Sequence, residues 1–577
     1  MTGRVMLAAG LLALIAAPAD AAPRLRAFDS CAALVRYADA HAPRAGRIGV
    51  LPMPAGAPEA TSAPAAAPDV SQTNVQEAGV DEPDVVKTDG RTLFAIARGR
   101  LQAVDARAAT PRVLGSVALP AGGGHELLLA KGRVLVISRA LAEPIPLPRP
   151  VEPGPGPVAV APTDAMPPYR PPQTILTEID VHDPAAMRVV ASLTVDGTPA
   201  GARLHGATAR VVLSSSPLGY VQPVTRSKPA GWVPRATLRQ GDRERTRRLV
   251  PCRSVRRPIA FGGAGMLSVL TIDLERGLPA VDADALMTDA DTVYASADSL
   301  YVATQRFDPK RPVATTSIHR FDTADARRTS YAASGTVPGR LLSQFALSQD
   351  DGVLRAASTE DGETSQSFVT TLTQRDGRLE QVGQVGGIGH GERIYAVRFI
   401  GPVGYVVTFR QTDPLFTIDL SDPAAPRVAG ELELLGYSAY LHPVGDGRLL
   451  GVGQDANADG RLKGAQASLF DVSDPAHPRR LAQRALGAAA SADVEYDHHA
   501  FLWWPATRLA VLPFSGDRAG AVGLRVGDRS IDEVRRVDEP VRRVTVVGDR
   551  VFELTDDGLI VAGLETLAPE GRVEFAP

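Results

Sequence analysis

Three stretches of this sequence are near copies of one another. They are "LTEIDVHDPAAMRVVASL" (176–193), "LFTIDLSDPAAPRVAGEL" (415–432) and "ASLFDVSDPAHPRRLAQRAL" (467–486). Weaker copies are "LSVLTIDLERGLPAV" (267–281) and "SIHRFDTADARR" (317–328). A short unit that repeats in this way cannot bury its apolar faces alone, so it must stack on its neighbours. The repeats therefore predict an array of similar units.

The spacing of the repeats identifies the kind of unit. One Asp follows the apolar run in each copy, at intervals of about 46 to 52 residues, with Thr373 in one equivalent place: Asp273, Asp322, Asp419 and Asp471. This period suits a four-stranded blade of a β-propeller. Residues 392–434 read as four successive strands separated by turn signals. We expect the repeated Asp to be structural, because an Asp at a strand end can accept hydrogen bonds from N–H groups of the next turn.

Almost no helical periodicity occurs beyond Asp84, so the fold class is all-β. Units begin near nine positions: Asp84, Glu126, Ala200, Asp291, Leu341, Glu392, Tyr440, Val494 and Val541. One of the terminal units can be a partial one that closes the ring, so we expect a propeller of about eight four-stranded blades, within a range of seven to nine. Two Pro-rich or Arg-rich insertions lengthen the early units, at 143–172 and 226–258.

The first residues have the features of a signal peptide. Arg4 precedes an apolar run from Met6 to Ala17, and Ala19-Asp20-Ala21 fits the small-x-small cleavage rule. We therefore expect residues 1–21 to be removed near Ala21, and the protein to be secreted or periplasmic. No later run is long and apolar enough to suggest a transmembrane segment.

The residues after the signal peptide form two short regions before the propeller. Residues 22–50 contain one amphipathic helix, with Leu34, Val35 and Ala38 on one face after an Asp29/Ser30 cap. Residues 51–73 are rich in Ala and Pro and should form an extended tether. The propeller domain is then expected to occupy residues 74–577.

Charge content bears on the class of partner, and cysteine content bears on disulfide bonding. There are 62 Lys and Arg against 65 Asp and Glu, without a strongly basic half, so a nucleic-acid surface is not indicated. Cys31 and Cys252 are the two cysteines. In an exported protein we expect a disulfide between them, since each is the other's sole available partner; two unrelated buried thiols are the alternative.

Three ordered motifs carry a family resemblance: "NVQEAGVDEPDVVKTDG" (74–90), residues 391–478, and "VEYDHHAFLWW" (494–504). With them the chain resembles the bacterial and archaeal family of secreted proteins that contain a C-terminal β-propeller distantly related to WD40 repeats. The likeness includes "DSC" at Asp29 and a Cys at the position of Cys252. It implies a propeller fold and export, and it supplies no catalytic residues.

One loop has the pattern of a calcium site. "DANADG" (455–460) matches D-x-N-x-D-G, in which alternate side chains face one cation and Gly permits the turn. Asp455, Asn457 and Asp459 would be the ligands. Gln466 or Lys463 stands where a closing acidic ligand is needed, so an Asx-rich hairpin without an ion is the alternative. No cofactor is required by the sequence, and Ca²⁺ is the one possible ion.

Two further groups of residues are candidate sites. "EYDHHAF" offers Asp497, His498 and His499. An Asp–His pair could orient an imidazole for base catalysis, but a nucleophile or metal partner would also be needed; we expect the Asp497/His498 pair to bond between strands. Asp81, Glu82 and Asp84 precede the innermost strand of the first blade and should lie at the mouth of the central channel. They could bind a cation or a basic segment. We expect instead that they point apart, each accepting a backbone N–H group or pairing with an arginine.

These observations favour a non-enzymatic exported binding or scaffolding module, because no catalytic constellation is recognisable. Its partner would be a protein or envelope component, engaged through a propeller face or through the Pro-rich loop. The Arg-rich insertion is either a solvated cover loop or a patch for an anionic partner. The alternative function is a propeller hydrolase or lyase outside the cytoplasm, with acidic residues at the central channel.

Overall fold

A computed structural model of the chain describes residues 25–41, 69–140, 172–216, 228, 231–259, 261–263, 265–288, 292–308, 311–362, 364–409, 413–457, 459, 461–487, 491–516 and 519–576. The expected signal peptide (1–21) lies outside these residues. So do most of the expected tether (51–73) and nearly all of the Pro-rich insertion (143–172). Within the described part of the chain, no helix combines the length and the apolar character needed to cross a bilayer.

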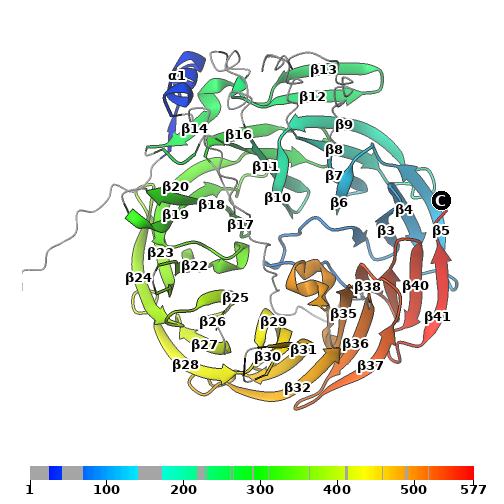
Figure 1. Cartoon of the computed structure of the whole chain (residues 1–577). Coiled ribbons are helices and arrows are strands. Elements are labelled where there is room, and N and C mark those ends of the chain that lie inside the picture. Colours follow the sequence, from blue (N-terminus) through cyan, green and yellow to red (C-terminus); the bar gives the residue numbers. More distant parts are fainter. Residues whose placement is uncertain are drawn as a thin grey trace, which may run out of the picture.

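The strands form a ring of radial blades around a central axis (Figure 1). In each blade four strands pair antiparallel in chain order from the axis outward. Blade 1 comprises β2 (Val86–Thr88), β3 (Thr92–Ala97), β4 (Arg100–Asp105) and β5 (Arg112–Ala118). Blade 2 comprises β6 (Gly123–Ala130), β7 (Arg133–Arg139), β8 (Gln173–Asp180) and β9 (Arg188–Asp196). Blade 3 comprises β10 (Thr198–His205), β11 (Thr208–Ser215), β15 (Met266–Asp273) and β16 (Asp282–Met287).

The middle of the ring follows the same order. Blade 4 comprises β17 (Thr292–Ala295), β18 (Ser299–Asp308), β19 (Arg311–Asp322) and β20 (Ser330–Pro338). Blade 5 comprises β21 (Leu347–Asp350), β22 (Val353–Glu360), β23 (Gln366–Arg375) and β24 (Arg378–Ile388). Blade 6 comprises β25 (Arg393–Ile400), β26 (Val403–Phe409), β27 (Asp413–Asp419) and β28 (Arg427–Leu434). A parallel contact between Ser334 and Arg378 joins blades 4 and 5 into one sheet.

The last three blades close the ring. Blade 7 comprises β29 (Tyr437–Gly445), β30 (Arg448–Ala456), β31 (Leu462–Asp471) and β32 (Arg479–Gly487). Blade 8 comprises β33 (Ser491–Ala492) and β34 (Leu502–Trp504), which both pair with β35 (Leu509–Ser515), followed by β36 (Gly520–Val526) and β37 (Ile531–Val537). Blade 9 comprises β38 (Arg543–Val547), β39 (Arg550–Leu554), β40 (Gly558–Gly563) and β41 (Pro569–Glu574).

The described residues thus hold nine blades, and the predicted all-β propeller is confirmed. The count falls within the predicted range of seven to nine and is one above the favoured eight. Nine clusters of buried apolar side chains occur in the described part, one at each boundary between neighbouring blades. The cluster that contains Leu93, Val104, Phe552 and Leu559 joins blade 9 to blade 1, so the ring is closed by side-chain packing.

The Arg-rich insertion adds strands to the outer sides of blades 2 and 3. β12 (Arg235–Gln240) pairs with β9, and β13 (Arg243–Arg248) follows as an exposed basic edge. β14 (Val255–Pro258) pairs with β16, and β1 (Leu25–Ala27) pairs with β14. The insertion therefore links the N-terminal region to the ring.

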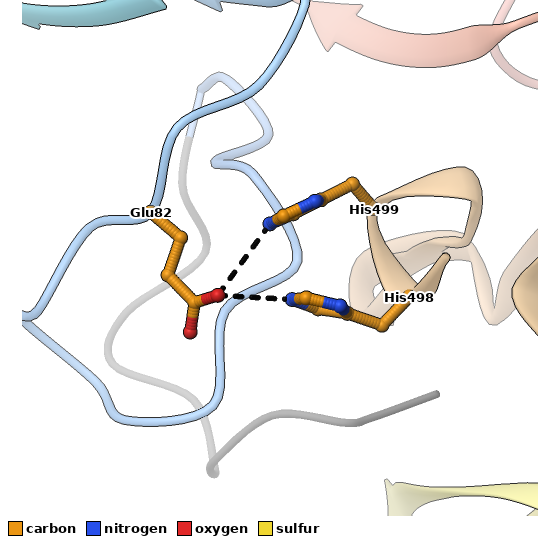
Figure 2. A group of neighbouring side chains, drawn as sticks. All are labelled: Glu82, His498 and His499. Atoms are coloured by element: carbon orange, nitrogen blue, oxygen red, sulfur yellow. Dashed lines mark hydrogen bonds and ion pairs between the residues drawn. The ribbon is translucent and has the colours of Figure 1, made fainter. Parts of the chain in front are cut away.

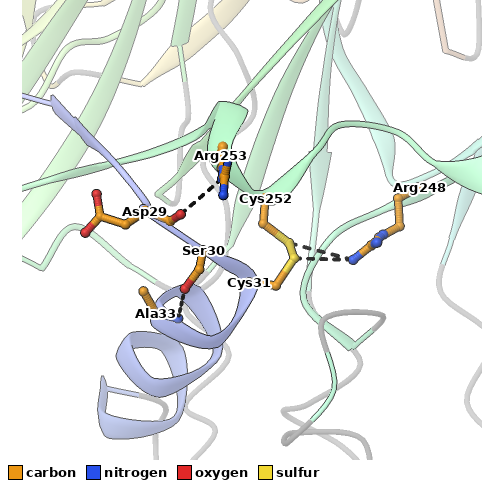
Figure 3. The surroundings of a disulfide bond; sticks show 7 residues. All are labelled: Asp29, Ser30, Cys31, Ala33, Arg248, Cys252 and Arg253. Carbon is orange, nitrogen blue, oxygen red and sulfur yellow. Dashed lines mark hydrogen bonds between the residues drawn. A yellow bond between two sulfur atoms is a disulfide. The ribbon is translucent and has the colours of Figure 1, made fainter.

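The predicted N-terminal helix is present as α1 (Cys31–His41), with Leu34 and Ala38 buried. The hydroxyl of Ser30 accepts a hydrogen bond from the N–H group of Ala33 at 3.1 Å and caps its first turn (Figure 3). The predicted disulfide between Cys31 and Cys252 is also present, with the two Cα atoms 5.1 Å apart. The helix is therefore covalently fixed to blades 2 and 3.

The repeated Asp residues have the structural role expected from the sequence. Each ends the third strand of its blade and accepts a hydrogen bond from the N–H group two residues later, at 2.9–3.2 Å: Asp180, Asp273, Asp322, Asp419 and Asp471. The Asp-Pro dipeptide that follows in the strongest copies continues this turn. Its proline carbonyl contacts the preceding blade, where Thr417 donates a hydrogen bond to Pro475 O.

A glycine in the outer strand of the preceding blade makes room for each of these turns. A Cβ atom at Gly430 would lie 2.4 Å from Pro475 O, and one at Gly383 would lie 2.3 Å from Pro423 O. Neither glycine has a positive φ. Close approach between blades, and not backbone conformation, is therefore the reason for glycine at these positions.

Substitution of Gly430 by Ala should lower the free energy of unfolding by about 1–3 kcal/mol, because the added methyl group overlaps Pro475 O. Gly571 is the matched control, since it occupies the equivalent place beside a bulge in the outer strand of blade 9, and a Cβ atom there meets nothing within 4 Å. Urea denaturation measures both variants. Equal stability of G430A and G571A would contradict the proposed role of the glycine.

Candidate functional site at the central channel

Residues 69–85, the central segment, cross the middle of the ring as the blue trace that precedes β2 (Figure 1). Their backbone pairs with the innermost strands of three blades. Val70 pairs with Val547 of β38, Asp81 with Leu204 of β10, and Asp84 with Leu127 of β6. The segment thus joins blade 9 to blades 2 and 3 across the axis.

Side chains of the central segment reach other blades. The Asn74 amide donates hydrogen bonds to Tyr440 Oη and to the carbonyl oxygen of His498, both at 2.7 Å. The Gln76 amide donates to the carbonyl oxygen of Leu347 at 2.9 Å. Tyr294 donates its hydroxyl hydrogen to Glu77 at 2.7 Å. The central segment therefore fills the channel and forms hydrogen bonds with blades 4, 5, 7 and 8 as well.

The three acidic residues at the channel have different partners. Asp81 accepts a hydrogen bond from Lys87 Nζ at 2.6 Å. Asp84 accepts from the N–H group of Val85 at 2.7 Å and from Arg543 Nε at 2.6 Å. Glu82 faces a separate set of residues contributed by blades 3, 5 and 8. The three carboxylates do not share one point, and Glu82 is the one that meets histidines.

The histidines come from an interruption in the inner strand of blade 8. Two short 3₁₀ turns, η7 (Asp493–Glu495) and η8 (His498–Ala500), separate β33 from β34. They lie near the centre of Figure 1, where the trace is orange. Asp497 caps η8 by accepting a hydrogen bond from the N–H group of His499 at 3.1 Å. The cap directs both imidazoles toward the central segment.

Glu82, His498 and His499 form a compact cluster (Figure 2). Glu82 Oε2 lies 3.2 Å from His498 Nε2 and 3.7 Å from His499 Nε2. The side chain of Glu82 is 4% exposed, and those of the histidines are 11% and 10% exposed. Glu82 also accepts hydrogen bonds from Gln76 N at Oε1 (3.2 Å) and from Gln344 Nε2 at Oε2 (3.3 Å).

Electrostatics differ between the two imidazoles. Burial and the neighbouring His499 lower the pKa of His498. Burial alone would also lower the pKa of His499, but the neighbouring carboxylates of Asp497 and Glu82 raise it to about 10. Burial would raise the pKa of Glu82, whereas Arg203 and His498 hold it well below the usual range. Glu82 is therefore favoured as a carboxylate, and the two imidazoles differ in proton affinity.

Arg543 connects this cluster to Asp84. Its Nε donates to Asp84 and its Nη2 donates to Asp497 at 2.5 Å, and its side chain is 11% exposed. Burial lowers the pKa of a guanidinium, but Asp84 and Asp497 raise that of Arg543. The Arg543 guanidinium therefore compensates two carboxylates, one before blade 1 and one in blade 8.

A cavity of about 460 Å³ lies next to this network. Its charged and polar lining residues are Arg98, His125, Glu126, Asp493, Asp497, Arg542 and Arg543. Burial raises the pKa values of Glu126 and Asp493. Burial would also raise the pKa of Asp497, but the hydrogen bond with His499 and the charge of Arg543 hold it far below the usual range. In this cavity Glu126 and Asp493 are thus protonated more readily than Asp497.

The loop expected to bind calcium lies between β30 and β31 of blade 7. The side-chain oxygen of Asn457 accepts hydrogen bonds from Asp459 N at 3.1 Å and Arg461 N at 2.8 Å. Asp455 accepts from Gln483 at 3.2 Å and lies 3.5 Å from Lys463 Nζ. These contacts are those of an Asx-rich hairpin, and calcium binding by the loop stays a prediction.

Comparison with known proteins establishes the family. The model of the beta propeller domain matches residues 70–567. The chain belongs to this beta propeller domain family. Related proteins include an uncharacterized protein of Archaeoglobus fulgidus, 46% identical over 167 residues, which are 29% of this chain and 25% of that protein. An uncharacterized protein of Methanocaldococcus jannaschii is 40% identical over 203 residues, 35% of this chain and 31% of that protein. The chain thus spans less than a third of the length of each relative.

Solved structures also align with part of the chain. A putative 6-phosphogluconolactonase from Bacteroides uniformis aligns with a TM-score of 0.34 and 14% identity, over 53% of this chain and 90% of that chain. Sqt1 of Chaetomium thermophilum, bound to the N-terminus of ribosomal protein L10, aligns with a TM-score of 0.36 and 11% identity, over 60% of this chain and 85% of that chain.

Sequence reasoning about this propeller named Glu82, Asp84, Asp497 and His498 but did not bring them together. It also named His499 in "EYDHHAF" but gave it no separate role. It missed Arg203, Gln344 and Arg543, which complete the site. Arg543 had no distinguishing signal, since it stands in "VRRV" among many surface arginines.

Proposed function

We propose that this propeller is an exported, non-enzymatic binding module whose partner is an envelope protein with a basic segment that also carries apolar side chains. Export is supported by the predicted signal peptide before Ala22 and by the disulfide, which persists in oxidising compartments. The observation that carries the binding proposal is a group of partly exposed aromatic side chains on one face of the ring.

That face is the one on which the innermost strands begin, and we call it the entry face. Tyr395 lies near the start of β25, Tyr437 begins β29 and Phe409 ends β26. Their ring centroids are 5.1–5.3 Å apart, and Tyr395 is 37% exposed. Leu435, which is 43% exposed, extends the group. Aromatic residues of this kind often supply most of the energy of a protein interface.

Acidic residues next to the aromatic group determine the charge of the expected partner. Glu431 and Glu433 are exposed on β28, and Glu392 precedes β25. Burial and the nearby Glu433 and Glu392 raise the pKa of Glu431, so this surface gains from an approaching cation. An aromatic patch bordered by carboxylates suits a segment that combines Lys or Arg with apolar side chains.

The test uses the exported protein to capture partners from an envelope fraction. We expect Tyr395→Ala with Tyr437→Ala to weaken binding of the captured partner by at least about tenfold, since loss of a central aromatic anchor typically costs more than 1 kcal/mol. Val534→Ala is the matched control, because Val534 is also 37% exposed but lies on the outer strand of blade 8. Equal capture by all three proteins would contradict the proposed surface.

The cavity supports a second candidate function, that of a hydrolase or lyase. Two carboxyl groups with raised pKa values beside one with a lowered pKa are an arrangement that acid–base catalysis uses. The same experiment separates the candidates. Cleavage of the captured partner by the wild type, but not by the Glu126→Gln variant, would replace the binding proposal with the enzymatic one.

A further inference from the structure

The cluster of Glu82, His498 and His499 has the spacing of metal ligands. One atom from each residue, the Glu82 oxygen and the two Nε2 atoms, lies within 4.8 Å of the others. In a tetrahedral zinc site with bonds of about 2.0–2.1 Å, ligand atoms are about 3.3 Å apart. The distances of 3.2 and 3.7 Å from Glu82 Oε2 to the imidazoles bracket that value.

His499 provides an independent indication of a ligand. Its side chain is 10% exposed, and its buried Nε2 atom forms no hydrogen bond with any residue that the structure describes; Glu82 Oε2 lies 3.7 Å away. A buried polar atom without a partner is costly in a folded protein. This atom points at the same Glu82 oxygen that His498 contacts (Figure 2). A cation between the three groups would satisfy it.

The residues around the cluster hold the ligands in place. Asp497 Oδ1 lies 3.2 Å from His499 Nδ1, so the carboxylate fixes the ring through its other nitrogen. Metal-bound histidines commonly have this carboxylate partner. Gln76 N and Gln344 Nε2 donate hydrogen bonds to the Glu82 carboxylate and hold it in place. The Phe345 ring meets His498 edge-on, with centroids 5.8 Å apart.

We propose that Glu82, His498 and His499 bind a divalent transition-metal ion, Zn²⁺ or an ion of similar chemistry. Two imidazole nitrogens and one carboxylate oxygen suit zinc and its neighbours, whereas Ca²⁺ and Mg²⁺ take oxygen ligands. The ion would join the central segment to blade 8, two regions 416 residues apart in sequence. This site is separate from the aromatic surface on blades 6 and 7 and does not depend on the proposed binding function.

The first measurement uses the full mature protein with its disulfide intact. The protein is stripped with a chelator, loaded with Zn²⁺, passed through gel filtration and assayed for bound metal. We expect one zinc per chain and a Tm that rises with Zn²⁺ concentration but not with Mg²⁺. Loading with Co²⁺ should give the visible absorption of a four-coordinate nitrogen and oxygen site, a signal that a purely structural hydrogen-bond cluster does not produce.

Variants assign the signal to these residues. Glu82→Gln, His498→Gln and His499→Gln should each weaken zinc binding by more than about 100-fold, because loss of an outer partner alone typically costs 10–100-fold. His477→Gln is the control, since His477 is an exposed histidine that pairs with an acidic residue elsewhere. Circular dichroism establishes that each variant retains the fold. A wild type that retains no zinc and shows no cobalt spectrum would overturn the proposal, as would retention by all three ligand variants.

Discussion

Replacing Arg543 by Met should lower the free energy of unfolding by about 3–5 kcal/mol, the cost typical of removing one partner from a buried ion pair. Arg543 pairs with Asp84, whose side chain is 4% exposed, and with Asp497. The methionine would leave the Asp84 carboxylate buried without a compensating charge. The loss should also loosen η8, because Asp497 caps it. Chemical denaturation followed by circular dichroism gives the measurement.

Arg572→Met provides the comparison for that variant. Arg572 lies in the same blade and pairs with Glu539, but the two side chains are 38% and 39% exposed. A pair this exposed contributes about 0–1 kcal/mol. The double variant Asp84→Asn with Arg543→Met should recover part of the lost stability, since it removes the unpaired charge. A loss for R543M no larger than for R572M would show that the network does not stabilise the channel.

Removing the disulfide should lower the free energy of unfolding by a similar amount. The bond closes a loop between residues separated by 221 positions, and the chain-entropy model assigns such a loop about 5 kcal/mol. The double variant Cys31→Ala with Cys252→Ala should therefore unfold at a much lower denaturant concentration than the oxidised protein. Part of the loss should appear as release of α1, which the bond holds against blades 2 and 3.

A control with a reductant shows whether the loss of stability comes from the disulfide itself. Dithiothreitol should lower the stability of the wild type toward that of the double variant and should leave the double variant unchanged. Proteolysis would detect release of α1 as early cleavage within residues 25–41. Identical denaturation midpoints for the oxidised wild type and the double variant would contradict a stabilising role of the bond.

Local features of the fold were predictable because the residues that determine them are close in sequence. The repeated Asp lies two residues from the N–H group that it binds, as in Asp419 and Ser421. The helix cap at Ser30 is equally local. The nine unit starts in the sequence match the nine blades of the described residues. The favoured count of eight was one lower because it allowed for a partial terminal unit, whereas blades 1 and 9 each have four strands.

The site depends on contacts that local patterns do not encode. Glu82 and His498 are 416 residues apart and meet only after nine blades have set the curvature of the ring. Arg543 lies 459 residues from Asp84 and has the same sequence context as exposed arginines. Acidic residues that precede the first strand predict a position at the channel. Which side chains they contact is decided only when the ring closes.

The pairing of the central segment with the last blade also constrains the order of folding. Val70 and Ser71 are synthesised before blade 1, whereas their partners Val546 and Val547 lie in the first strand of blade 9. Until blade 9 is made, the apolar faces of blades 1 and 8 that end the array have no neighbour, and the N–H group of Ser71 lacks its acceptor. A chain that ends before β38 thus exposes two apolar blade faces, and its central segment lacks its pairing partner in blade 9. Exposed apolar surface makes such an incomplete chain prone to aggregation, so the ring is protected only once blade 9 is complete.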